Sequence, residues 1–211
     1  MKRLERKHPL AIRWFHWINF PILALMIWSG TLIYWANAVY FVKLAPPTWQ
    51  KLNLAFRLAE GMAYHFFFMW IFAINGIAYV LYTMFSGAWR ELLPNRRSFV
   101  EAIQVTLYDL HLRREAPPQG KFNAAQRISY SAIIVMGLFS LLTGVAIYKP
   151  VQFAWLCRLF GGYQTARALH FYLTVGYVLF FVVHIVQVIR AGWNNFRSMI
   201  IGAEVREVAG E

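Results

Sequence analysis

The sequence is poor in charged residues, which excludes an ordinary soluble domain. Only 14% of its 211 residues are Asp, Glu, Lys or Arg, whereas a soluble domain has about 25%. Hydrophobic residues make up 59% of the chain and aromatic residues 18%. This composition predicts an integral membrane protein. The formal net charge of +12 does not predict nucleic-acid binding, because positive charge beside membrane spans commonly sets their orientation.

Cysteine is nearly absent as well, with Cys157 as the single example. One thiol excludes an internal disulfide, and a zinc site built on cysteines is not expected. The sequence also has no C-x-x-C-H pattern, which excludes haem attached in the c-type manner. Any haem bound by this chain is therefore expected to be non-covalent.

Four apolar runs are long enough to cross a bilayer as helices. They lie at about 14–36, 61–85, 128–148 and 168–190, and a spanning helix needs about 20 residues. A signal peptide is the alternative for the first run, but that run exceeds the roughly 7–15 residues of a signal core. We predict an all-α membrane protein, a four-transmembrane-helix bundle that forms a single domain over residues 1–211.

Lysine and arginine are unevenly distributed between the connections. The N-terminal head, the 86–127 connection and the tail from Arg190 carry 15 of these residues, and the 37–60 and 149–167 connections carry 6. Positively charged connections stay in the cytoplasm. Both termini are therefore predicted to be cytoplasmic, and the 37–60 and 149–167 connections periplasmic.

The long 86–127 connection contains one amphipathic stretch. Ser98 and Glu101 have the spacing of a capping box, and apolar residues then recur at helical spacing, at Phe99, Ile103, Leu107 and Leu110. A proline- and glycine-containing stretch at 116–120 would end the helix. We predict a short helix over 98–112 that lies on the membrane surface or packs against a soluble partner.

Two histidines lie inside the last apolar run, at His170 and His184. Fourteen helical residues turn the chain through nearly four complete turns and advance it by about 21 Å. Both imidazoles therefore leave the same face of the helix, one near each edge of a bilayer core of about 30 Å. Ionisable residues inside a membrane commonly mark functional sites, and this spacing suits two metal centres stacked across the membrane.

Two more histidines fall inside spans, and they match the first two in depth. His16 lies near the cytoplasmic start of the first span, at the level of His184, and His65 lies near the periplasmic start of the second, at the level of His170. Two imidazoles from different helices at equal depth are suited to bind a haem iron from both faces. We predict the pairs His16/His184 and His65/His170; hydrogen-bonding core histidines or a proton relay are the alternatives.

Glycines support this interpretation. Gly30 follows His16 by fourteen residues and lies on nearly the same helix face, where a missing side chain would let a macrocycle approach the backbone. Packing between helices is the alternative role for small residues in membranes. The same two roles are open for the other glycines inside the spans, which are Gly76, Gly137, Gly144 and Gly176.

The first span carries a recognisable motif. Its start, Arg13-Trp14-Phe15-His16-Trp17, and its Ser29-Gly30 pair resemble the first helix of the bacterial di-haem cytochrome b subunits. These are the membrane subunits of Ni/Fe-hydrogenases, formate dehydrogenases and thiosulfate-reductase-type molybdoenzymes. The positions of His65, His170 and His184 match the ligand pattern of that family, and the resemblance covers all four spans.

The resemblance implies a function. A member of this family holds two haem b groups between histidine pairs in the bacterial cytoplasmic (inner) membrane. It passes electrons between a periplasmic catalytic or electron-carrier subunit and membrane quinone, as an electron-transfer subunit rather than the catalytic one. Two alternatives remain open. One is a self-sufficient haem reductase of a small periplasmic substrate. The other is a transporter with a histidine relay, a class that often shows paired halves, although no such repeat is expected here.

Polar residues beside the inner histidine pair are candidates for a quinone site. Gln187 follows His184 by three residues and Asn19 follows His16 by three, so each lies near its histidine on the helix surface. An amide can donate to a quinone carbonyl or accept from a quinol hydroxyl. The alternatives for Gln187 are orienting a haem propionate or bonding a neighbouring helix. Four arginines near the span ends are further propionate candidates, namely Arg13, Arg57, Arg167 and Arg190.

Overall fold

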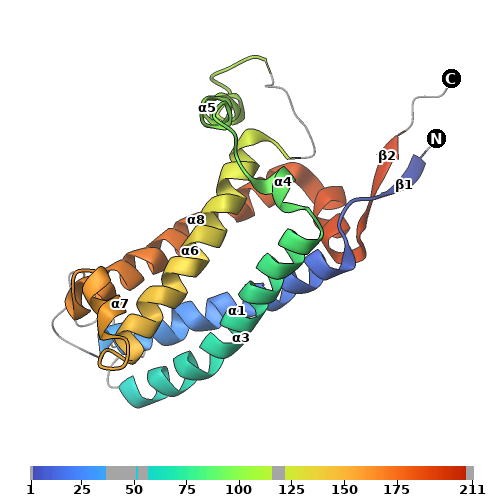
Figure 1. Cartoon of the computed structure of the whole chain (residues 1–211). Coiled ribbons are helices and arrows are strands. Elements are labelled where there is room, and N and C mark those ends of the chain that lie inside the picture. Colours follow the sequence, from blue (N-terminus) through green and yellow to red (C-terminus); the bar gives the residue numbers. More distant parts are fainter. Residues whose placement is uncertain (1, 37–50, 52–56, 116–121, 208–211) are drawn as a thin grey trace. The chain divides into compact units, whose positions relative to one another are not determined.

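Four long helices dominate the fold. The computed structural model describes residues 2–36, 51, 57–115 and 122–207. Within these residues, four helices are long and apolar enough to cross a membrane (Figure 1): α1 (Leu10–Trp35), α3 (Leu58–Phe85), α6 (Ala124–Tyr148) and α8 (Tyr163–Ile201). Each predicted span coincides with one of them, which confirms the all-α, four-span class. The helices extend beyond several predicted ends, because helical hydrogen bonding is not confined to the most apolar part of each run.

The chain divides into two compact units. One consists of Met1–Tyr79 with His184–Glu211, and the other of Val80–Val183. Helices α3 and α8 each begin in one unit and end in the other. The description of residues 1–211 as a single domain stays a prediction, as does the cytoplasmic placement of both termini. Most of the predicted 37–60 connection lies outside the described residues.

In the first unit, a short antiparallel ribbon joins the two ends of the chain. Strands β1 (Lys2–Arg6) and β2 (Ala203–Glu207) pair in a register that sets Leu4 opposite Val205 (Figure 1). Lys7 donates to the Asn195 side chain at 2.9 Å and forms an ion pair with Glu204 at 2.5 Å. The sequence had indicated only a basic head and a polar tail, because neither segment alternates clearly enough to predict a strand.

Further contacts attach the start of α1 to the end of α8. The Trp17 indole donates to the Met199 carbonyl at 2.9 Å, and the Arg13 guanidinium donates to the Ile200 carbonyl. The last part of α8 takes its direction from Gly192, whose φ of 79° breaks the helix into two consecutive segments. Such a backbone conformation strongly favours glycine. The ribbon and these contacts therefore tie the N-terminal turns of α1 to the segment that follows the break.

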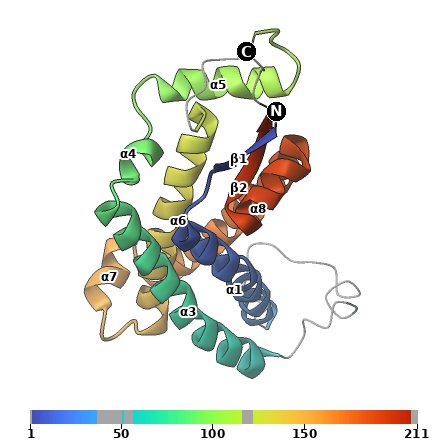
Figure 2. The same cartoon turned by 90° about the vertical axis from the view of Figure 1, so that its right-hand side faces the viewer.

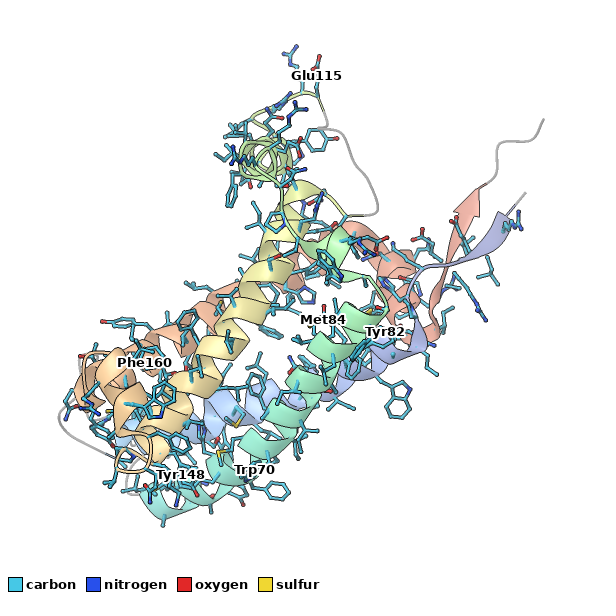
Figure 3. The ribbon with its side chains drawn as sticks, viewed as in Figure 1. Trp70, Tyr82, Met84, Glu115, Tyr148 and Phe160 are labelled. Carbon is cyan, nitrogen blue, oxygen red and sulfur yellow. The ribbon has the colours of Figure 1, made fainter. Side chains whose placement is uncertain are left out.

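In the second unit, short helices surround α6. They are α4 (Trp89–Leu92), α5 (Ser98–Asp109) and α7 (Ala154–Leu159). Figure 2 shows α5 lying across the end of α6. At the other end of α6, Ala146 packs with Leu156, Cys157 and Ala166 in a buried cluster, and Phe160 (Figure 3) packs against it. The beginning of α6 is closed by a reciprocal Asn123/Gln126 capping box.

Large apolar side chains point outward from the spanning helices. Trp70 on α3 projects away from the ribbon (Figure 3) and is 63% exposed. On α5, the predicted apolar residues Phe99 and Ile103 are about as exposed, at 61% and 62%. Lipid covers such surfaces in a membrane. For α5, contact with the membrane surface and contact with a soluble partner both remain open.

The cap predicted for α5 is wrong. Ser98 does not cap the helix with Glu101; it pairs with Asn95, one turn earlier. The Ser98 backbone N–H donates to the Asn95 side-chain carbonyl at 2.9 Å, and the Asn95 backbone N–H donates to the Ser98 hydroxyl at 3.0 Å. Asn95 therefore stabilises the turn that leads into α5, and the helix itself has no side-chain cap at its N-cap residue, Arg97. The helix also ends earlier than predicted, at Asp109, and His111 follows with a left-handed φ of 60°. The stretch 116–120 lies outside the described residues.

Replacing Asn95 should therefore weaken the start of α5. We expect Asn95→Ala to lower the free energy of unfolding by about 0.5–1.5 kcal/mol, because the variant loses the hydrogen bonds that the Asn95 side chain accepts from Ser98. Thermal unfolding of the purified protein followed by circular dichroism measures the effect. Glu101→Ala is the control and should change stability by less than about 0.5 kcal/mol. Equal destabilisation by both variants would instead support the Ser98/Glu101 cap that the sequence predicts.

Candidate functional site

Within the first unit, the structure brings His16 and His184 together. His16 is on α1 and His184 is on α8, and their ring centroids are 6.1 Å apart with an angle of 54° between the ring planes. The contacts of Trp17 and Arg13 with the end of α8 hold the two helices at this separation. Both imidazoles are partly buried.

The spacing of this pair fits a shared metal ion. An imidazole nitrogen binds a transition metal at about 2 Å, so two imidazoles on opposite sides of one ion have ring centroids about 6 Å apart. The Nδ1 atom of His16 is buried and has no hydrogen-bond partner among the described residues. A buried ring nitrogen without a partner is costly. The pair is therefore suited to a ligand that binds between the rings.

His65, also in the first unit, is held by α1. Its Nδ1 atom lies 3.0 Å from the Ser29 hydroxyl, which itself donates to the Leu25 carbonyl at 2.7 Å. Gly30 lies beside the same ring, because a Cβ atom added there would come within 3.4 Å of His65 Cε1. Two consecutive residues therefore adjoin the imidazole. Ser29 contacts it through its hydroxyl, and Gly30 leaves room for it because glycine has no side chain.

His170, in the second unit, has the same surroundings. Its Nδ1 atom lies 2.9 Å from the Thr143 hydroxyl, which donates to the Phe139 carbonyl at 2.6 Å. A Cβ atom added to Gly144 would come within 3.4 Å of His170 Cε1. A hydroxyl residue followed by glycine on one helix thus contacts a histidine on another helix in each unit.

This repeated arrangement was missed in the sequence, although a signal is present. Residues 29–34 read Ser-Gly-Thr-Leu-Ile-Tyr and residues 143–148 read Thr-Gly-Val-Ala-Ile-Tyr. A small residue also precedes each histidine by four positions, Gly61 before His65 and Ala166 before His170. The match is short and the helices around it differ, so only the shared hydroxyl–imidazole contact gives it weight.

Other glycines have packing roles. Gly61 lies so close to α1 that an added Cβ would be 2.8 Å from Leu32 Cβ and 3.1 Å from the Ser29 carbonyl oxygen. Gly176 faces the Met136 side chain, and Gly137 faces the Tyr177 hydroxyl. These positions agree with the helix-packing alternative. Gly76 differs from them, since an added Cβ would meet nothing within 4 Å.

The remaining candidates lie at the ends of the spans. Gln187 on α8 is exposed, and Asn19 on α1 is partly buried; both are one turn from a histidine of the His16/His184 pair. The four arginines near the span ends all have protein partners. Arg13 donates to the Ile200 carbonyl, Arg57 pairs with Glu60, and Arg167 donates to the Gln164 side chain.

Comparison with known proteins agrees with this geometry. Partly buried imidazoles on membrane-spanning helices, each beside a glycine or another imidazole, are suited to hold a haem in a membrane protein. The chain belongs to the prokaryotic cytochrome b561 family, whose model matches residues 7–202. It is also similar to a putative protein-methionine-sulfoxide reductase subunit, YedZ1, of Azospira oryzae, with 31% identity over 189 residues that cover 89% of this chain and 92% of the relative. The predicted resemblance to bacterial cytochrome b membrane subunits is confirmed, and so is the multi-pass location in the bacterial inner membrane.

The tight contact at Gly61 gives a prediction for the His65 surroundings. Gly61→Ala should force α1 and α3 apart, because the new methyl group meets backbone atoms that cannot rotate away. We expect a loss of about 1–3 kcal/mol in stability and a lower haem content, measured by thermal unfolding and by the pyridine haemochrome absorbance.

Gly76→Ala is the matched control on the same helix. It should be neutral or stabilising by up to about 1 kcal/mol, since alanine has the higher helix propensity and the space around Gly76 is open. Equal losses in the two variants would contradict the packing role of Gly61.

Proposed function

We propose that this protein is a di-haem electron-transfer subunit that passes electrons between a periplasmic redox partner and the quinone pool. The observation that carries the proposal is the state of the four intramembrane histidines. His16 and His184 lie at the separation of two ligands of one metal ion, and His65 and His170 share one pattern of neighbours. Haem b bound by such imidazoles supplies one-electron redox chemistry.

Two haem sites at different depths account for these positions. On α1, His16 and Gly30 are fourteen residues apart, and on α8 so are His184 and His170. Each helix therefore contributes to two layers about 21 Å apart. We assign one haem to His16 and His184, and the other to His65 and His170. Gly30 and Gly144 supply open backbone beside the second pair.

A separate catalytic subunit is proposed as the redox partner. The relative from Azospira oryzae is named as a subunit of a reductase, which favours a partner that consumes electrons over one that supplies them. Electrons would then pass from membrane quinol to a periplasmic reductase. A hydrogenase or a molybdoenzyme is the alternative partner. Turnover of a small periplasmic substrate by the purified chain alone would instead support a self-sufficient haem reductase.

The quinone is proposed to bind on the cytoplasmic side, beside the His16/His184 pair. Gln187 and Asn19 lie one turn from these histidines, on α8 and α1 of the same unit. An amide at either position is able to hydrogen-bond a quinone oxygen. Cytoplasmic placement rests on the distribution of lysine and arginine among the connections.

Haem content tests the ligand assignment. His16→Ala and His184→Ala should each remove the same haem, because both imidazoles would hold it. His65→Ala and His170→Ala should each remove the other haem. Reduced-minus-oxidised absorption spectra with redox titration separate the two components.

His8→Ala and His111→Ala are the controls, because neither residue is in a predicted span, and both variants should keep both haems. Loss of the same spectral component from the His65 and His184 variants would contradict the pairing. If all four ligand variants kept two intact haems, the proposed function would be contradicted.

The kinetics of electron exchange with quinone test the proposed quinone site. Gln187→Leu should slow electron exchange with a quinol analogue and weaken inhibition by quinone analogues, with both haems spectrally intact, because leucine keeps the size and loses the hydrogen bond. The loss of one such bond costs about 0.5–1.5 kcal/mol, or roughly 2–12-fold in the apparent affinity.

The matched control is Val186→Leu, at an exposed neighbouring position on a different side of α8. Unchanged kinetics and inhibition in Gln187→Leu would remove this residue from the quinone site. An inhibitor that perturbed only the His65/His170 haem would move the site to the periplasmic side.

A further inference from the structure

Two buried hydroxyl groups face histidines, Ser29 beside His65 in the first unit and Thr143 beside His170 in the second. Ser29 on α1 lies 3.0 Å from His65 Nδ1, and Thr143 on α6 lies 2.9 Å from His170 Nδ1. Both hydroxyl residues are 0% exposed. Water therefore cannot take their place, and the contact between hydroxyl and imidazole is the local means of satisfying each ring nitrogen.

The direction of the Ser29 hydrogen bond follows from counting hydrogens. A serine hydroxyl has one hydrogen and two lone pairs. Two backbone carbonyls, which can only accept, lie near it: Leu25 at 2.7 Å and Met26 at 3.2 Å. The hydrogen is therefore directed to the backbone, and the oxygen offers His65 a lone pair. His65 must then carry its own hydrogen on Nδ1.

The same count holds for Thr143. Its single hydroxyl hydrogen faces the Phe139 carbonyl at 2.6 Å, with the Ser140 carbonyl as a second acceptor at 3.4 Å. Its oxygen therefore accepts from His170 Nδ1. In both units the ring is held as the Nδ1–H tautomer, so that Nε2 keeps the lone pair that a metal ion requires.

We propose that Ser29 and Thr143 are positioning residues that fix the tautomer and the orientation of His65 and His170 as haem ligands. This inference rests on the proposed function. A hydrogen bond from the far ring nitrogen raises the basicity of a ligating imidazole. A more basic ligand stabilises ferric iron more than ferrous iron. The two hydroxyls therefore lower the midpoint potential of the haem that these histidines bind.

Removing either hydroxyl should raise that potential. Ser29→Ala and Thr143→Val each delete the acceptor, and the second variant keeps the side-chain shape. We expect the midpoint potential of the His65/His170 haem to rise while that of the other haem stays unchanged. A change on the order of tenfold in the relative stability of the two oxidation states equals about 59 mV for one electron. Redox titration followed by absorbance measures both haems in the purified full-length protein.

Electron paramagnetic resonance provides a second readout. The g-values of a low-spin ferric haem depend on the orientation of its axial imidazoles, so a freed ring should broaden or shift the signal of the same haem. Thr143→Ser keeps a hydroxyl at the same position and should restore both the potential and the signal. If Ser29→Ala does not accumulate as folded protein, Thr143→Val carries the test alone, because valine matches threonine in volume.

Two neighbouring hydroxyls are matched controls. Thr31 donates to the Trp28 carbonyl at 2.6 Å, and Thr174 donates to the backbone carbonyl of His170 at 3.1 Å. Neither contact involves an imidazole ring, so Thr31→Val and Thr174→Val should leave both potentials unchanged. Equal shifts in these controls would overturn the proposal, since a general packing effect would explain them.

The failure of this inference is distinguishable from the failure of the proposed function. Unchanged potentials and signals in Ser29→Ala and Thr143→Val, with one haem lost from His65→Ala, would overturn the positioning role and leave the haem assignment standing. Two intact haems in both His65→Ala and His170→Ala would overturn the haem assignment and this inference together.

Discussion

Water is absent from the bilayer core, and this constraint governs the polar contacts of the spanning helices. A polar group that faces hydrocarbon without a partner is costly, so each described polar side chain in a span matters to the packing around it. Ser29 and Thr143 use their hydrogens on their own helices and their oxygens on a histidine of another helix. Asn75 on α3 donates to the Phe15 carbonyl on α1 in the same way. Hydrogen bonds thus help to select which helix faces meet, where lipid tails provide no hydrophobic preference.

Small residues make these contacts possible. The hydroxyl of Ser29 reaches His65 because Gly61 lets α3 approach the backbone of α1. In the second unit, Ala146 and Ala166 are both fully buried in one cluster beside the Thr143–His170 contact. In the first unit the larger Leu32 faces Gly61. In the second unit two alanines, Ala146 and Ala166, pack together instead. The two units reach one imidazole geometry with different distributions of side-chain volume.

The ends of the chain set the geometry of His16 and His184. His16 is near the start of α1 and His184 precedes the break at Gly192 in α8, so a short local structure is enough to hold them together. The paired strands, the Lys7–Glu204 ion pair and the Trp17–Met199 hydrogen bond provide it. Apart from Trp17, these residues lie outside the apolar runs, although they position residues inside them. A haem between these imidazoles would add its own bonds to that framework.

The sequence by itself determined the class of the protein. Uncharged runs of about 20 residues define membrane helices because the bilayer excludes charge, and the fourteen-residue spacing of His170 and His184 defines one helix face because helical periodicity is a local property. The sequence also predicted the family, through the residues around His16 and the Ser29-Gly30 pair. Only the tertiary structure decided what the histidines touch. The contacts of Ser29 and Thr143, the close approach at Gly61, the ribbon between the chain ends and the Asn95–Ser98 turn before α5 depend on pairs of residues that are separated in sequence or compete locally. Such pairs are settled by packing and by the number of available donors and acceptors, which no periodic pattern records.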